Sequence, residues 1–107
     1  MNNERPTKDI VTPISKQTVS IVTYVTGRDK RALRNIYLMS DISDSDRINM
    51  AQDLSWKTVV VAIDGKKDGE VDIVDSILSM NATDTAFIVK EVDRVTADLP
   101  FEEKKTN

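Results

Sequence analysis

The sequence predicts an α+β fold, in which a small antiparallel sheet of two or three strands packs against three or four helices. Segments rich in β-branched residues alternate with segments whose apolar residues recur at helical spacing. The length of 107 residues fits one domain, and 39% hydrophobic against 31% charged residues allows a core of modest size. We therefore expect a flexible N-terminus at residues 1–8, a single domain at residues 9–97 and a flexible C-terminal tail at residues 98–107.

Three segments have the composition of strands. Residues 17–25 read QTVSIVTYV and are rich in β-branched and aromatic residues, with an apolar face at every second position. Residues 10–14 contain a proline, which restricts a strand there to the edge of the sheet. Residues 56–63 read WKTVVVAI, an apolar run that predicts a buried central strand. An Asp-Gly pair follows this run, so residues 64–69 should form a turn.

A helix with a recognisable start is predicted over residues 27–39. The hydroxyl of Thr26 can cap it, and Asp29 stands three residues later, where a capping box places glutamate. Leu33 and Ile36 then follow at helical spacing.

Three shorter patterns predict the remaining helices. Residues 45–54 favour a short helix, and residues 71–78 carry a wide apolar stripe that includes positions 71, 74 and 78. A last helix begins at Asn81 or Thr83, continues to about residue 95 and is expected to pack on the sheet. The expected core consists of apolar residues that face inward on these elements: Val19, Ile21, Leu33, Ile36, Val60, Ala62, Val74, Leu78, Ile88 and Val92.

Charge is distributed unevenly along the chain. Residues 1–35 contain seven basic and three acidic residues, a balance of +4. Because the whole chain carries −3, the remainder carries −7. Such a dipole would allow self-association from head to tail, although the same asymmetry also fits an ordinary solvated surface.

The residue types that most enzymes depend on are missing from the sequence. The absence of cysteine excludes disulfides, thiolate metal sites and a thiol nucleophile. The absence of histidine removes the commonest general base and the commonest metal ligand. None of the three glycines belongs to a phosphate-binding loop. We expect no catalytic activity and no cofactor.

An acidic segment at residues 64–75 has part of the spacing of a calcium loop. Aspartates occupy its first, fifth, ninth and twelfth positions. However, Lys66 stands where the second ligand belongs, and Asp75 replaces the bidentate glutamate. A turn followed by the start of a helix is therefore the favoured interpretation.

The sequence contains no membrane-directing segment that we recognise. No run approaches the roughly 18 apolar residues of a membrane span. The first residues, MNNERPTKD, lack the hydrophobic centre of a signal peptide. We expect the protein to stay in the cytoplasm in which it is made.

The predicted helix at residues 27–39 has a basic outer face that includes Arg28, Arg31 and Arg34. A nucleic acid is one possible partner. However, the pI is about 4.9 and Tyr37 is the one aromatic residue near this face. A protein-facing or solvated surface is the favoured interpretation.

Apolar residues elsewhere divide into core and tail. Trp56, the sole tryptophan, is expected in the core. Leu99 and Phe101 in the tail either fold back onto the last helix or stay exposed as a binding peptide. The residues to which we assign partner binding are Arg28, Arg31, Arg34, Leu99 and Phe101.

Three segments between residues 17 and 97 carry a family resemblance. Residues 26–34 read TGRDKRALR after a predicted strand, residues 59–65 read VVVAIDG before a predicted helix, and residues 87–92 read FIVKEV. With these segments, residues 17–97 resemble the small tail assembly chaperones of long-tailed phages. The first segment is similar to the family's T-G-R-E-K-R opening, with Asp29 in place of glutamate, and the last is similar to its F-V-x-E-I ending.

This resemblance implies a chaperone in the cytoplasm of an infected host cell. Such a protein binds the tape-measure protein, keeps it soluble and promotes assembly of the tail tube around it, so the major tail tube protein is a further possible partner. The family often makes a longer product by ribosomal frameshifting. The alternatives are a structural tail component, such as a tail-completion or connector protein, and a small nucleic-acid-binding regulator.

Overall fold

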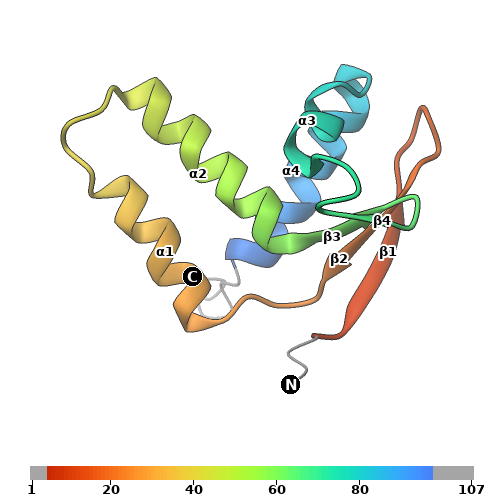
Figure 1. Cartoon of the computed structure of the whole chain (residues 1–107), viewed down its shortest axis with the longest axis horizontal. Coiled ribbons are helices and arrows are strands. Elements are labelled where there is room, and N and C mark those ends of the chain that lie inside the picture. The colour runs from red at the N-terminus through yellow and green to blue at the C-terminus, as the bar shows by residue number, and fades with distance from the viewer. Residues whose placement is uncertain (1–4, 98–107) are drawn as a thin grey trace, which may run out of the picture.

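The computed structural model describes residues 5–97 of the chain and confirms an α+β fold (Figure 1). Within that range lie four strands and four helices. In chain order they are β1 (Thr7–Val11), β2 (Thr18–Val22), α1 (Gly27–Tyr37), α2 (Asp44–Val59), β3 (Val60–Ile63), β4 (Lys66–Lys67), α3 (Ile73–Leu78) and α4 (Ala82–Ala97).

The sheet is fully antiparallel, with the strands in the order β1-β2-β3-β4. Its first strand is an edge strand, but it covers Thr7–Val11, so Pro13 lies in the turn after the strand and not within it. Residues 7 and 8 therefore belong to the sheet and not to the flexible N-terminus expected at residues 1–8. The fourth strand was not predicted, because it contains only two residues and lies in the segment expected to be a turn.

This fourth strand depends on the turn at Asp64 and Gly65. Both residues have positive φ angles, 51° and 81°, which a two-residue turn needs if its twist is to match that of the strands it joins. Asp and Gly tolerate this backbone region better than other residues do. The Asp64 carboxylate also accepts a hydrogen bond of 2.9 Å from the backbone N–H of Thr18, and this bond holds the turn against β2.

The prediction of a strand over residues 56–63 is wrong in its first half. Helix α2 begins after Ser43, whose hydroxyl accepts a hydrogen bond from the Asp46 N–H, and continues to Val59. Its buried residues, Ala51, Trp56 and Val59, lie on one helical face. Trp56 is in the core as expected, with 1% of its surface exposed, but it reaches the core from a helix.

Two predicted helix starts are confirmed in detail. Thr26 and Asp29 form a reciprocal capping box: the Asp29 N–H donates to the Thr26 hydroxyl at 3.1 Å, and the Thr26 N–H donates to the Asp29 carboxylate at 3.0 Å. At the start of α4, the side chain of Asn81 accepts a hydrogen bond of 2.8 Å from the Thr83 N–H. Asn81 is therefore the cap of this helix.

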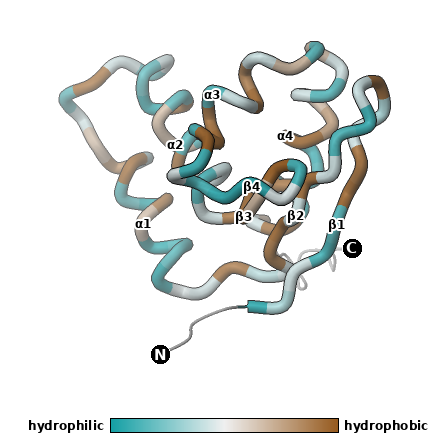
Figure 2. The backbone as a smooth tube through the Cα atoms, turned by 45° about the vertical axis from the view of Figure 1, so that its right-hand side comes forward, coloured by the Kyte–Doolittle hydropathy of each residue, from teal (hydrophilic) through white to brown (hydrophobic). Residues whose placement is uncertain are grey.

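The core lies where β2 and β3 meet α2, α3 and α4, and these two strands are largely hydrophobic in Figure 2. Helix α4 has most of its close neighbours in α2 and α3, and its buried residues share one cluster with the sheet. Six residues of the expected core are buried: Val19, Ile21, Val60, Ala62, Ile88 and Val92.

Four expected core residues lie elsewhere. Leu33, Ile36 and Val74 are half-buried, and Leu78 has 59% of its surface exposed. Helix α3 faces inward through Ile73 and Ile77, because it begins two residues later than expected and turns a different side to the sheet.

One charged side chain, that of Asp84 in the first turn of α4, is fully buried. Its two oxygens accept hydrogen bonds from the backbone N–H groups of Ile14 at 2.8 Å and Ser15 at 2.9 Å, in the turn between β1 and β2. Burial raises the pKa of this carboxyl, but these hydrogen bonds, together with the charge of Lys16, outweigh burial and bring the pKa below 3.8. Asp84 therefore joins the β1–β2 turn to α4 as a carboxylate.

Candidate protein-binding surface

Helix α1 has an apolar side that the rest of the fold covers only in part. None of its eleven residues is buried, and Leu33 and Ile36 are only half-buried. A helix of this length is marginal in water without tertiary packing. Polar contacts at its N-terminal end hold it in place: an ion pair of 2.8 Å between Arg5 and Asp29, and a hydrogen bond of 3.1 Å from the Lys30 ammonium to the Ala97 carbonyl.

Exposed apolar side chains gather where α1 turns into α2. Among residues 5–97, nine large hydrophobic side chains are exposed, and five of them lie between residues 37 and 50. Leu38 and Ile48 are the most exposed of these five, at 70% and 60%. Single exposed apolar residues are ordinary, but a group of them marks an interaction surface. We call four of them the hairpin patch: Tyr37, Leu38, Met39 and Ile48. Met50 stands two residues from Ile48 and therefore lies on another side of α2.

Arg47 holds the connection between the two helices in a fixed shape. Its guanidinium donates hydrogen bonds to the carbonyl oxygens of Met39 and Ile42 and pairs with the carboxylate of Asp44. The last carbonyls of a helix and those of a loop otherwise need water as a partner. The connection that carries the hairpin patch is therefore exposed but already held in one conformation, so a partner would not lose binding free energy in ordering it.

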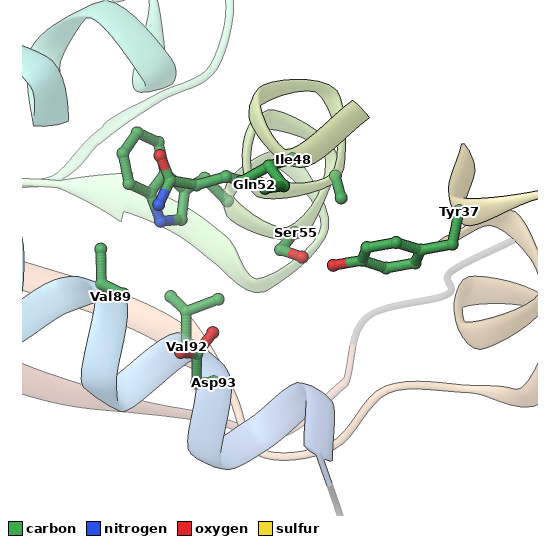
Figure 3. Close-up of a pocket in the computed structure, with 9 residues that line it drawn as sticks. Tyr37, Ile48, Gln52, Ser55, Val89, Val92 and Asp93 are labelled. Carbon is green, nitrogen blue, oxygen red and sulfur yellow. The ribbon is translucent and has the colours of Figure 1, made fainter. Parts of the chain in front are cut away.

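A groove of about 180 Å³ opens beside the hairpin patch, between α1, α2 and α4. Tyr37 and Ile48 belong to both features, while Trp56 and Val92 line the inner part of the groove. Figure 3 shows the Tyr37 side chain extending from α1 with its hydroxyl toward Ser55 of α2. Pockets for small molecules generally start at about 300 Å³, so this groove is suited to a large side chain of a partner.

The arginines assigned to partner binding lie on α1, and none of them lines this groove. Arg28, Arg31 and Arg34 are all exposed, and steps of three residues place them along one side of α1. Within residues 5–97 none of them forms an ion pair. We call these three residues the arginine row. The other two assigned residues, Leu99 and Phe101, lie outside the described residues.

The arginine row leads directly into the hairpin patch. Leu38 follows Arg34 by four residues and Tyr37 follows it by three, which are the two spacings that make side chains neighbours on a helix. Sequence periodicity found the row. The patch was missed because it combines the end of α1 with the start of α2, and the groove because it combines residues from three helices.

In the acidic segment at residues 64–75, carboxylates accept hydrogen bonds from backbone N–H groups. Asp64 accepts a hydrogen bond from the Thr18 N–H, and Asp72 caps α3 by accepting one from the Asp75 N–H at 3.0 Å. Throughout the described range, acidic residues form no group of three or more with the spacing to hold a metal ion. The segment consists of the Asp64–Gly65 turn, the short strand β4 and the capped start of α3, so the predicted turn and helix start are present and the strand between them was not predicted.

The two carboxyl groups with a shifted pKa both serve the fold. Burial raises the pKa of Asp29, but hydrogen bonds from the Thr26 N–H and from Arg5 bring it below 3.8. Asp84 is bound to the β1–β2 turn as described above. Neither carboxyl lines the groove, whose lining combines the apolar side chains of Trp56 and Val92 with the polar ones of Gln52, Ser55 and Asp93.

Comparison with known proteins leaves the surface to be interpreted from its own chemistry. No protein-family model, no curated protein and no solved structure matches the chain. Among the helices of residues 5–97, none combines the length and the apolar character needed to cross a membrane.

Proposed function

We propose that this protein is a phage tail assembly chaperone, which acts in the cytoplasm of the infected cell and covers an apolar segment of the tape-measure protein until the tail tube encloses it. The observation that carries the proposal is the hairpin patch, a group of exposed apolar side chains held in place by Arg47.

The physical task of such a chaperone fits the properties of this chain. A long helical protein with apolar stripes aggregates unless those stripes are covered, and a groove between helices is a common receptor for such a stripe. The chain also carries a net charge of −3. A net charge away from zero favours the solubility of the chaperone and of a complex with it.

The first motif of the family resemblance, residues 26–34, lies at the start of α1 and includes the arginine row. Thr26 and Asp29 serve the helix by capping it. The arginines of the same motif make no ion pair in the described part of the chain, so their role is open to a partner. The segment that most resembles the chaperones therefore combines a folding signal with a binding face.

Co-expression with the tape-measure protein encoded in the same phage genome tests this proposal. The wild-type chain should keep the tape-measure protein in the soluble fraction, because its apolar stripes are covered. A variant with Leu38→Ser and Ile48→Ser should lose this effect while keeping its melting temperature, because both residues are mostly exposed. Leu78→Ser is the matched control, since Leu78 is exposed to a similar degree but lies on α3.

Two results would contradict the proposal. One is a tape-measure protein that is equally soluble with and without this chain. The other is a high copy number of the chain in purified virions measured by mass spectrometry, which would favour a structural tail component.

A further inference from the structure

Building on the proposed function, we propose that the hairpin patch receives an amphipathic helix whose apolar stripe is bordered by carboxylates on one side, and that these carboxylates pair with the arginine row. The inference adds the chemistry and the orientation of the bound segment.

The shape of the surface favours a helix as the occupant. Three helices form the groove, and its volume of about 180 Å³ accommodates one large apolar side chain. The patch extends the apolar surface beyond the groove to Leu38. A helix presents apolar anchors three or four residues apart, so one anchor can enter the groove while its neighbours lie on the patch.

The charges along this surface favour acidic residues on one border only. On the α1 side, the arginine row is exposed, and Arg34 precedes Tyr37 by three residues and Leu38 by four, the spacings of neighbours on a helix. On the α4 side, the groove is lined by Asp93. A helix bound between them should therefore carry carboxylates toward α1, where they can form bidentate pairs with arginine, and should lack them toward α4.

An uncharged or basic border on the α1 side would be disfavoured. It would cover the guanidinium groups without replacing their hydrogen bonds to water, which is costly. The rest of the chain outside residues 1–35 has a charge of −7, and Asp41, Asp44 and Asp46 of that part lie between Met39 and Ile48. The carboxylates of a bound helix are therefore repelled from the α2 side and attracted toward the arginine row.

Trp56 provides a direct measurement. It is the sole tryptophan and lines the groove, so binding of a tryptophan-free peptide should change its fluorescence. The probes are two helical peptides of about three heptads with the same leucine stripe. One has glutamate and the other lysine along one border of the stripe, with serine and glutamine along the other border.

We expect the glutamate peptide to bind at least about tenfold more tightly, the size expected when several exposed charge pairs change sign together, and to bind more weakly in high salt. The double variant Arg31→Glu, Arg34→Glu should reverse this preference. The matched control is Lys66→Glu with Lys67→Glu, which changes the net charge equally on strand β4, away from α1 (Figure 1), and should preserve the preference. Leu38→Ser with Ile48→Ser should weaken both peptides.

Equal affinity for the two peptides, or a preference that survives the arginine reversals, would overturn the inference. So would failure of both peptides to bind while the tape-measure protein is still kept soluble, and the proposed function would then stand without it. If the peptides bind as expected but the chain does not keep the tape-measure protein soluble, the inference about the binding surface stands and the proposed chaperone function is contradicted. Binding of a double-stranded DNA oligonucleotide that needs the arginine row but not Leu38 would identify a nucleic-acid surface and overturn the inference.

Discussion

Asp84 joins two distant segments of the fold through its buried carboxylate, and its sequence context does not reveal this role. At the sequence level it is one of eighteen acidic residues, in the first turn of a predicted helix, where an acidic residue is common. Its hydrogen-bond partners lie about 70 positions earlier in the chain. Local patterns cannot report a contact of that range, and for this reason the buried carboxylate was not predicted.

The lowered pKa of Asp84 predicts a specific loss of stability in acid. Because the folded state binds this proton less readily than the unfolded state, the carboxylate stabilises the fold fully above the ordinary pKa of 3.8, and the contribution is lost as the pH falls through the folded pKa. The variant Asp84→Asn should be less stable than the wild type at pH 7, and its stability should change less between neutral and acidic pH. Urea denaturation across this pH range measures both effects, and parallel pH profiles for the two proteins would contradict the assignment.

Gly27 and Gly65 differ in backbone conformation, so alanine should affect stability in opposite directions at the two positions. Gly27 has no atom within 4 Å of the position that a Cβ would occupy, and it is helical, with no positive φ. Gly27→Ala should therefore raise the free energy of unfolding by about 0.4–1 kcal/mol. The same change at Gly65, where φ is +81°, should lower it by about 1–2 kcal/mol. Thermal denaturation measures the stability of both variants. A change of the same sign in both would contradict the φ angles of these two glycines.

Among the elements, those with local signals were predicted best. Helix α1 starts with a capping box that involves residues three positions apart, so its start could be predicted from sequence. Residues 56–63 had no such signal, since an apolar run suits a buried strand and a buried helix equally. The helix that begins after the Ser43 cap continues to Val59, so residues 56–59 are helical.

Helix α3 shows why a helical face is hard to choose from sequence. Apolar residues surround much of this six-residue helix, so two stripes with acceptable spacing compete. The sheet and α4 select the stripe that contains Ile77, and Leu78 remains exposed. A short helix with a wide apolar surface therefore needs its neighbours before its orientation can be known.

A pair of matched substitutions tests this orientation. Ile77→Gln should lower the free energy of unfolding by about 2–5 kcal/mol, because it removes a fully buried side chain and brings a polar group into the core. Leu78→Gln should change it by less than about 0.5 kcal/mol, as is usual for exposed positions. Urea denaturation followed by Trp56 fluorescence measures both, and a larger loss for Leu78→Gln would mean that α3 faces the other way.

For the molecule as a whole, the fold class and the arginine row were predictable, and the binding surface was not. Fold class follows from the alternation of strand-like and helix-like segments, which is a property of the sequence. The arginine row follows from spacing on a single helix. The groove requires Tyr37, Trp56 and Val92 from three helices, and Arg47 became a candidate only when its contacts with the Met39 and Ile42 carbonyls were known.

The bond network of Asp84 has a consequence for the dynamics of the whole molecule. The amide hydrogens of Ile14 and Ser15 lie in an exposed turn, where rapid exchange with solvent deuterium would be the ordinary expectation. Both are bound to a carboxylate that is buried in α4. They should therefore exchange only when the β1–β2 turn separates from the first turn of α4, and their protection would report how often these two distant segments come apart.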